Sequence, residues 1–247
     1  MRLDQFLVEK KIVRSRSQAK DFILRGSVEL KDSKGKWQKV FKPNHQCNEM
    51  TEVRLASGED STWVARSGLK LDSALERLGL SPSGLACLDL GQSTGGFTQS
   101  LLRRGAKQVV GVDVGHDQIA KDLREDDRVV CYEGVDARKI EFLKKDFRFD
   151  LIAVDLSFIS FLKVLPSVLD VLGGGASVVV LYKPQFEVGK EIVGKTGLVQ
   201  SAALQLSCQK TLFDALNRAS VEVLDYFPSA VKGKNGNQEF ICHFRIM

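Results

Sequence analysis

The sequence predicts two domains, a small basic α+β domain followed by a larger α/β domain built on a mostly parallel sheet. Three observations lead to this division. Positive charge is concentrated in the first 42 residues, which hold 12 Lys and Arg against 5 Asp and Glu. A polar stretch near residue 60 then separates two hydrophobic patterns. Beyond it, apolar runs of strand length alternate with helical segments, which is typical of a parallel sheet covered by helices on both faces.

The composition of the 247 residues bounds the class of protein. A hydrophobic share of 43% and a mean hydropathy of −0.10 are typical of a globular protein with a sizeable core. No run of 18 apolar residues is present and the N-terminus lacks a signal peptide, so we expect a cytoplasmic protein without a membrane segment. The five cysteines are scattered, which favours reduced thiols over a metal site. The basic segment predicts a polyanion partner, and a merely solvated basic face is the alternative.

Two helices are expected near the start of the chain. Apolar residues spaced by three and four between Leu3 and Leu7 predict a first short helix. Ser15 and Gln18 fit the capping box of a second helix, and Gly26 stands where a glycine would end it.

Short strands are expected at Ser27–Lys31 and Thr51–Leu55, with a Lys-rich loop from Lys31 to Lys42 between them. The first domain therefore covers residues 1–58, a linker covers residues 59–66, and the second domain covers residues 67–247.

The second domain opens with a helix at Leu69–Leu78 and continues with seven strands. The predicted strands are Ala86–Leu90, Gln108–Asp113, Val129–Tyr132, Leu151–Asp155, Ser177–Tyr182, Glu222–Phe227 and Glu239–Ile246. Apolar stripes predict helices from Phe161 to Leu172 and from Leu204 to Ala215. The last two strands follow one another without a helix, so we expect them to pair antiparallel at one edge.

The strongest chemical signal is a turn rich in glycine and hydroxyl residues that follows the first of these strands. It runs from Asp89 to Thr98, and its glycines let a ligand approach the backbone at the start of a helix. The next strand ends in Asp113, which is placed to accept hydrogen bonds from ribose hydroxyls. Because the turn is not G-x-G-x-x-G, S-adenosylmethionine fits better than NAD. A tight strand–helix turn without a ligand is the alternative.

Two further charged residues end neighbouring strands. Asp155 follows the fourth strand and Lys183 follows the fifth, at the edge of an open α/β sheet where ligands bind. Lysine is almost never buried unpaired, so packing alone explains Lys183 poorly. A plain salt bridge between the two is the alternative to a catalytic role.

Several segments together resemble the TlyA (hemolysin A) family, whose catalytic half is similar to the FtsJ-type ribosomal RNA methyltransferases. They include Arg2-Leu3-Asp4, Ser15–Ala19, Arg25–Val28, Trp63–Leu71, Asp89–Thr98, Asp155–Ser160, Lys183–Gly189 and Gly233–Phe240. The resemblance covers essentially the whole chain. It implies a Rossmann-like class I methyltransferase domain with a seven-stranded sheet, preceded by an RNA-binding domain of the ribosomal-protein-S-four type.

The resemblance also implies a catalytic tetrad that falls on Lys70, Asp155, Lys183 and Glu239. We expect Lys183 to take the proton of a ribose hydroxyl, with Asp155 and Glu239 orienting the two lysines. Two lysines that keep their charge and stabilise the developing alkoxide are the alternative. The expected cofactor contacts are Asp89, Gly91, Ser93, Thr94, Gly95, Gly96, Phe97, Asp113, Asp136 and Asp155. The expected RNA contacts are Arg2, Lys10, Lys11, Arg14, Arg16, Lys20 and Arg25.

The expected function is S-adenosylmethionine-dependent 2′-O-methylation of ribosomal RNA at cytidine, with ribosomal RNA or ribosomal subunits as partner and no membrane or metal. The first domain departs from the family because a longer Lys-rich loop replaces the Val-Asn-Gly turn. Three other classes compete with this hypothesis: a nicotinamide oxidoreductase, a non-enzymatic RNA-binding protein, and the membrane-active hemolysin that the family label suggests. The glycine pattern disfavours the first class, and the four charged residues disfavour the second. No amphipathic segment supports the third.

Overall fold

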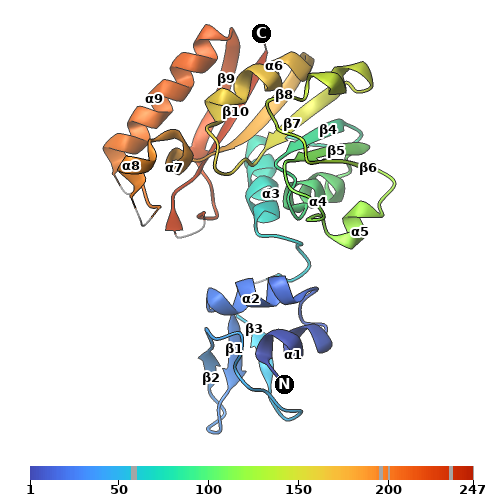
Figure 1. Cartoon of the computed structure of the whole chain (residues 1–247), viewed down its shortest axis with the longest axis vertical. Coiled ribbons are helices and arrows are strands. Elements are labelled where there is room, and N and C mark those ends of the chain that lie inside the picture. Colours follow the sequence, from blue (N-terminus) through green and yellow to red (C-terminus); the bar gives the residue numbers. More distant parts are fainter. Residues whose placement is uncertain (57–59, 195–196, 200, 234–235, 247) are drawn as a thin grey trace. The chain divides into compact units, whose positions relative to one another are not determined.

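The computed structural model describes residues 1–56, 60–194, 197–199, 201–233 and 236–246, except for the side chain of Lys190. The expected boundary between the first domain and the linker lies outside the described residues. The chain forms two compact units, Met1–Ala65 and Arg66–Met247 (Figure 1). Each unit has its own hydrophobic core.

The first unit packs two helices on a three-stranded antiparallel sheet. Its elements are α1 (Leu3–Glu9), α2 (Arg16–Leu24), β1 (Val28–Lys31), β2 (Trp37–Lys39) and β3 (Val53–Leu55), and the strand order is β2-β1-β3. The expectation of an uninterrupted loop from Lys31 to Lys42 was wrong. The edge strand β2 interrupts this segment. It is short and polar, so the sequence shows no apolar alternation there, and it forms because β1 offers backbone partners in register.

The start of α2 shows how a local signal is completed by a distant segment. The hydroxyl of Ser15 accepts the N–H of Gln18 at 3.2 Å, as a capping residue does. The side chain of Gln18 does not return to Ser15. Its oxygen accepts the N–H of Arg14 at 2.7 Å, and its nitrogen donates to the carbonyl of Trp63 at 2.7 Å. Residues 61–63 are thereby tied to the first unit.

The second unit is a seven-stranded sheet with the order β6-β5-β4-β7-β8-β10-β9. Its strands are β4 (Ala86–Leu90), β5 (Gln108–Asp113), β6 (Val129–Glu133), β7 (Phe149–Val154), β8 (Leu172–Tyr182), β9 (Val221–Pro228) and β10 (Phe240–Ile246). The first five pair in parallel. β10 lies antiparallel between β8 and β9, which confirms the antiparallel edge expected from the sequence.

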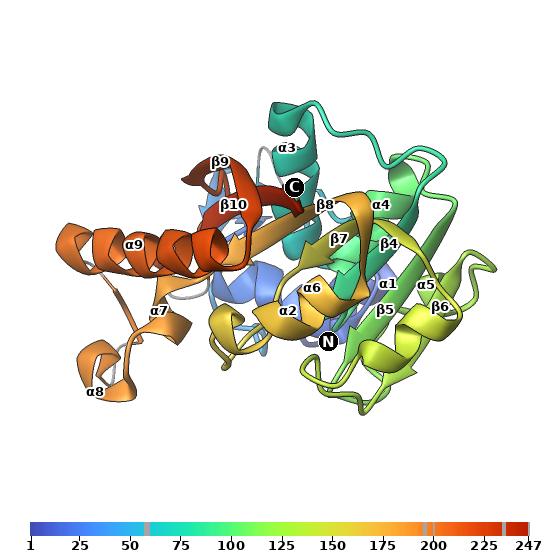
Figure 2. The ribbon, with the colours of Figure 1, turned by 90° about the horizontal axis from the view of Figure 1, so that it is seen from above.

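Helices cover both faces of this sheet. The segments are α3 (Ser67–Leu78), α4 (Gly96–Arg103), α5 (Lys121–Arg124), η1 (Glu141–Lys145), η2 (Phe161–Lys163), α6 (Leu165–Val171), α7 (Pro184–Glu187), α8 (Lys190–Val193) and α9 (Ala202–Arg218). Buried residues of η1, α6 and α9 share one core with alternate residues of the central strands. Figure 2 shows α3 on the opposite side of the sheet from α6. The central strands are buried on both faces, which explains their continuous apolar runs.

Candidate active site at the carboxyl ends of the strands

The parallel strands β5, β4, β7 and β8 end at one edge of the sheet, where open α/β folds bind their ligands. Acidic residues stand at three of these ends, Asp113 in β5, Asp89 in β4 and Asp155 after β7. Lys183 follows the fourth. The topology therefore gathers residues that are far apart in the sequence.

Lys183 and Asp155 form a nearly buried ion pair. Nζ of Lys183 lies 2.6 Å from Oδ1 of Asp155, and their side chains are 8% and 14% exposed. The geometry at Oδ1 of Asp155 is that of an ion pair and not of a hydrogen bond. Lys183 also donates a hydrogen bond to the hydroxyl of Ser157 at 3.1 Å. An ammonium taken out of water needs such compensation, and these two contacts also fix the direction of Nζ.

A second ion pair joins Lys70 of α3 to Glu239, which directly precedes β10. Their charged atoms lie 2.6 Å apart, and the side chains are 11% and 4% exposed. The other oxygen of Glu239 accepts the side-chain N–H of Gln185 at 3.1 Å. A Cβ atom on Gly233 would lie 2.2 Å from this carboxylate, so glycine here lets the carboxylate lie close against the backbone.

The two pairs lie on neighbouring strands. Tyr182 of β8 pairs with Phe240 of β10, so Lys183 and Glu239 extend from adjacent antiparallel strands. Gln185 follows Lys183 by two residues and contacts Glu239, which links the two pairs at the same edge. The structure thus brings all four expected tetrad residues together as two ion pairs from four separate segments.

The glycine turn packs directly against this arrangement. Gly91 has a φ of +89°, and a Cβ atom there would lie 2.4 Å from the carbonyl oxygen of Asp155. Gly95 has a φ of +93°, and its Cβ atom would lie 2.4 Å from Leu123. The positive φ favours glycine at both positions, and at Gly91 the backbone of Asp155 also leaves no room for a Cβ atom. The side chains of Ser93 and Thr94 between them are exposed.

Asp113 is held in place by backbone donors. One carboxylate oxygen accepts the N–H of Ser93 at 2.9 Å, and the other accepts the N–H of Gly115 at 2.7 Å. The residue is half-buried, and each carboxylate oxygen retains a further lone pair. Asp113 therefore presents an oriented acceptor at the end of β5.

Asp89 is fully buried at the end of β4. The hydroxyl of Thr98 donates to one carboxyl oxygen at 2.7 Å, and the other oxygen has no hydrogen-bond partner among the described residues. Burial, helped by the nearby charges of Asp155 and Asp113 and opposed by the hydrogen bond from Thr98, raises the pKa of Asp89 to about 7. Three carboxyl groups that repel one another favour a ligand that carries positive charge. The sulfonium and ammonium groups of S-adenosylmethionine fit this chemistry.

Two other expected cofactor residues contribute differently. Phe97 is 2% exposed, so its side chain belongs to the core and does not offer a surface to a ligand. Asp136, after β6, is held by the backbone N–H and guanidinium of Arg138. The Arg138 side chain lowers the pKa of Asp136 to about 2, and the carboxylate stays ionised at neutral pH. Among the described residues, no group of three or more His, Cys, Asp or Glu is placed to hold a metal ion.

Glu187 is a buried charged residue that residue-level reasoning missed, although it lies in one of the segments that carry the resemblance. It ends α7, and its carboxylate accepts the hydroxyl of Ser160 at 2.6 Å and the N–H of Phe161 at 2.8 Å. Burial raises the pKa of Glu187. The contacts tie α7, which follows Lys183, to the segment that follows Asp155.

A cavity of about 340 Å³ lies beside the second ion pair. Its lining residues are Phe158, Gln185, Phe186, Val188, Val193 and Gly194. Phe158 is 93% exposed with a φ of +65°, and its ring lies 5.3 Å from that of Phe186. Because Gln185 lines the cavity and also contacts Glu239, the cavity adjoins the tetrad.

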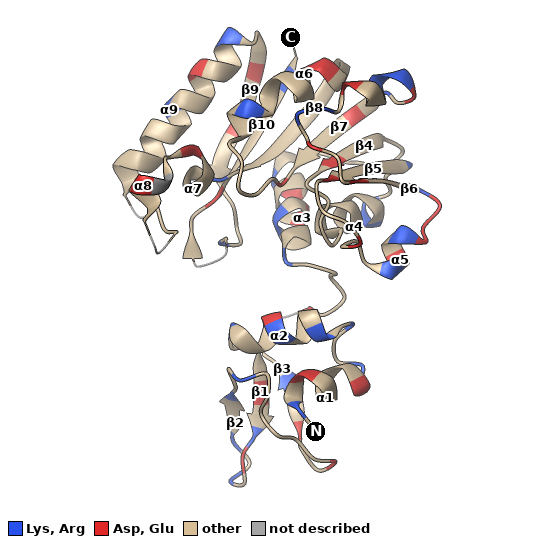
Figure 3. Cartoon of the chain, viewed as in Figure 1, with Lys and Arg blue, Asp and Glu red and all other residues tan. Residues whose placement is uncertain are grey.

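The expected RNA-binding residues lie in the first unit, where Lys and Arg are spread over α1, α2 and the loops (Figure 3). Arg2 and Arg16 both donate to Asp4, which is fully buried and which the sequence did not single out. Burial alone would raise the pKa of Asp4, but these two guanidinium groups lower it. Arg25 stacks 4.1 Å from the ring of Phe22. The remaining four in this set, Lys10, Lys11, Arg14 and Lys20, are exposed.

Comparisons with known proteins agree with the fold. The family described as FtsJ-like methyltransferase matches residues 63–246, and the S4 domain matches residues 1–30. A Mycobacterium tuberculosis protein named 16S/23S rRNA (cytidine-2′-O)-methyltransferase TlyA is 36% identical over 99% of this chain and 89% of its own length. Hemolysin A of Brachyspira hyodysenteriae is 35% identical over the full length of both chains.

A solved structure described as a hemolysin from Streptococcus thermophilus superposes with a TM-score of 0.78 at 34% identity. It covers 100% of this chain, and this chain covers 88% of that one. These matches confirm the expected fold class, a Rossmann-like methyltransferase domain preceded by a small S4 domain. No helix in the described part of the chain is long and apolar enough to cross a membrane.

Proposed function

The chain belongs to the FtsJ-like methyltransferase family, and from that premise we propose that it methylates the ribose 2′-hydroxyl of cytidine in ribosomal RNA, using S-adenosylmethionine. The observation that carries the proposal is the pair of buried Lys–carboxylate contacts at the strand ends, beside the glycine turn. The RNA and the cytidine come from the names of the relatives. The methyl donor is supported by the family and by the acidic strand ends.

The residues that would hold the cofactor are the backbone of the Gly91–Phe97 turn, the carboxylate of Asp113 and the region of Asp136. When bound, S-adenosylmethionine supplies the methyl group. Asp89 and Asp155 would face its positive charge, which relieves their mutual repulsion.

Lys183 is the residue proposed to receive the proton of the ribose hydroxyl. Its Nζ accepts the proton as a neutral amine and becomes the ammonium that pairs with Asp155. This hydroxyl is a weak acid, so its attack benefits from a positioned acceptor. Asp155 and Ser157 hold Nζ of Lys183 in one direction, which is the positioning that proton transfer needs. Lys70, paired with Glu239, would keep its positive charge and stabilise the oxygen as negative charge develops on it.

The first unit is proposed to supply RNA affinity. Its S4-type match and its basic side chains support this role, because phosphate contacts dominate the affinity of RNA-binding proteins. The proposed contacts are the basic residues of α1, α2 and their flanks, with Asp4 fixing the side chains of Arg2 and Arg16.

Methyl transfer to ribosomal RNA and to purified ribosomal subunits tests the proposal, with the product nucleoside identified by mass spectrometry. We expect 2′-O-methylcytidine with the wild-type chain and none with Asp155→Ala. A methyl group on a base instead of the ribose would contradict the reaction.

Cofactor binding is tested separately by calorimetry, with NAD as a control ligand. Asp113→Ala removes an oriented charged acceptor, and hydrogen bonds to charged groups contribute about 1.5–3 kcal/mol each. The affinity for S-adenosylmethionine should therefore fall at least about tenfold. An unchanged dissociation constant would exclude Asp113 from the site.

A further inference from the structure

The outer face of the three-stranded sheet in the first unit carries an aromatic and cationic cluster on elements other than α1 and α2. Val28, Leu30 and Val53 point into the core, so the alternate residues of the same strands face solvent. The solvent-facing set on β1, β2 and β3 is Glu29, Lys31, Trp37, Lys39 and Arg54, as the strand register shows.

Trp37 is the centre of this cluster. It pairs in register with Lys31, whose Nζ lies 5.9 Å from the indole ring. The guanidinium of Arg54 lies 4.3 Å from the ring, and Glu29 holds it through a 2.8 Å ion pair. A half-buried indole whose neighbours are fixed offers a preformed surface for stacking.

The hairpin between β1 and β2 adds unmatched positive charge. Residues 31–42 contain five lysines and one acidic residue, Asp32. The carboxylate of Asp32 accepts the backbone N–H groups of Lys34 and Lys36 at 2.9 Å each, so its charge stabilises the turn. In the part of the chain that the structure describes, Lys34, Lys36 and Lys39 make no ion pair, and all three are exposed. Blue segments of the ribbon in Figure 3 mark Lys and Arg along this hairpin.

We propose that this face is a second RNA-binding surface, on which an unpaired nucleotide stacks on Trp37 while Lys34, Lys36 and Lys39 contact the adjoining phosphates. Single-stranded RNA suits both features, because stacking needs an unstacked base and lysines bind the backbone irrespective of sequence. A duplex would satisfy the lysines but leave the indole without a base. The inference rests on the proposed function only in taking RNA as the ligand.

Fluorescence gives a direct readout because the chain has two tryptophans, and Trp63 is buried with 7% exposure. In a Trp63→Phe background, a single-stranded 12-nucleotide RNA should quench Trp37, whereas the same sequence in a duplex should quench it much less. Trp37→Leu should weaken single-strand binding at least fivefold, and Trp37→Phe should keep most of it. A Leu variant that melts like wild type and binds with unchanged affinity would overturn the proposal.

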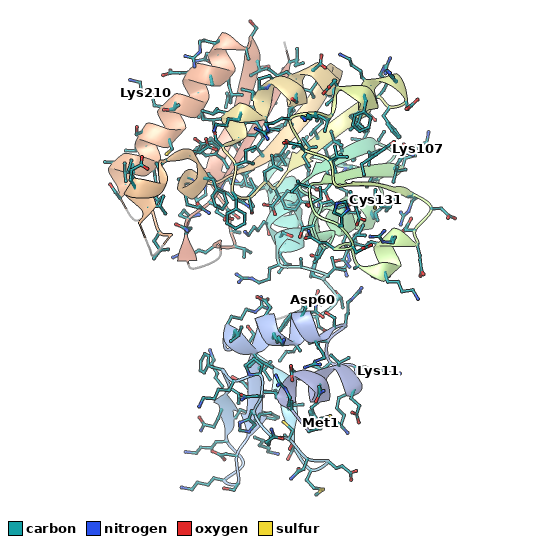
Figure 4. The ribbon with its side chains drawn as sticks, in the orientation of Figure 1. Met1, Lys11, Asp60, Lys107, Cys131 and Lys210 are labelled. Carbon is teal, nitrogen blue, oxygen red and sulfur yellow. The ribbon has the colours of Figure 1, made fainter. Side chains whose placement is uncertain are left out.

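The lysines are tested by a pair of double variants. The double variant Lys34→Ala with Lys36→Ala removes two phosphate contacts. The negative slope of log affinity against log salt should therefore become shallower by about 1.4. Lys107 and Lys210 of the second unit, labelled in Figure 4, are exposed lysines that provide the matched control. If both double variants changed the salt dependence of RNA affinity equally, these lysines would contribute only through the overall charge of the protein, and the proposal would be overturned.

Methyl transfer measured on the same preparations separates this inference from the proposed function. Methylation with no quenching of Trp37 would leave the function standing and remove the surface. Quenching of Trp37 without methylation of any ribosomal RNA would support the surface and contradict the proposed function.

Discussion

Lys183 is the residue on which the proposed chemistry depends most directly. Its ammonium is nearly buried, and Asp155 and Ser157 set its direction. That geometry suits a neutral amine that receives a proton from a weak acid, and it equally suits an ammonium that keeps a fixed positive charge.

Substitution with arginine distinguishes the two roles. A guanidinium stays protonated, so Lys183→Arg should lose about 10²–10⁴-fold in single-turnover methyl transfer if the lysine acts as a base. RNA and cofactor binding should persist. Lys70→Arg is the internal comparison, because a residue needed for charge tolerates arginine better. Near-wild-type rates for Lys183→Arg would leave Lys183 with a positioning role.

Asp89 makes stability depend on pH. Burial raises the pKa of its carboxyl from 3.8 to about 7 in the folded protein. Between about pH 4 and pH 7 the carboxyl is therefore protonated in the folded state and ionised in the unfolded state. Stability of the cofactor-free protein should fall as pH rises through this window. Asp89→Asn cannot ionise, so its melting temperature should exceed that of wild type by several degrees at pH 8 and by much less at pH 4. Thermal melts at both pH values measure this, and an equal difference at the two would exclude Asp89 as the cause.

At the scale of elements, the site depends on how short segments after the strands are held. The turn after β4 needs glycine at Gly91 because the segment after β7 passes against it. That segment is in turn tied to α7 by the carboxylate of Glu187. Asp155 and Lys183 flank these connections, so the connections determine where the first ion pair lies.

Glu187 is therefore expected to act as a positioning residue. Each of the two hydrogen bonds is worth roughly 1 kcal/mol. Glu187→Ala loses both, so methyl transfer should fall about 20- to 30-fold. Glu187→Gln loses one, so the rate should fall about 5-fold. Cofactor affinity should change little. Because burial raises the pKa of Glu187, the wild-type rate should also drop on acidification earlier than for an ordinary glutamate. The glutamine variant should lack this acid limb, and an identical pH profile for the two chains would contradict the role.

At the scale of the molecule, the two compact units are proposed to divide the work. The second unit has its own core and contains all four tetrad residues. Residues 61–63 belong with the first unit, because Gln18 donates to their carbonyl groups.

A chain that begins at Arg66 should fold, bind S-adenosylmethionine with near-wild-type affinity and lose most of its affinity for ribosomal RNA. The loss should be largest at low salt, where phosphate contacts contribute most. Circular dichroism, calorimetry and filter binding measure the three properties. RNA affinity equal to that of the whole chain would show that the units do not divide the work in this way.

The sequence by itself was enough to predict the α/β class, the seven strands of the second unit and the longer helices, but not the positions of the short segments β2, α5, η1, α7 and α8. The central strands are buried on both faces, so each is a continuous apolar run. Helix starts and ends depend on residues within one turn, such as Ser15 and Gly26. Asp155 and Lys183 stand at the ends of predicted strands, whereas Lys70 and Glu239 were reached only through family resemblance, because nothing local marks these two as belonging together.

Only the tertiary structure decided which charges pair. Lys70 meets Glu239 across 169 residues, and Lys183 meets Asp155 because β7 and β8 are parallel neighbours. The edge strand β2, the second half of the Gln18 cap and the anchoring by Glu187 likewise depend on partners from distant segments. Periodicity and capping are interactions within a few residues, and the sequence records them directly. Pairing at the ends of strands depends on strand order, which no local pattern contains.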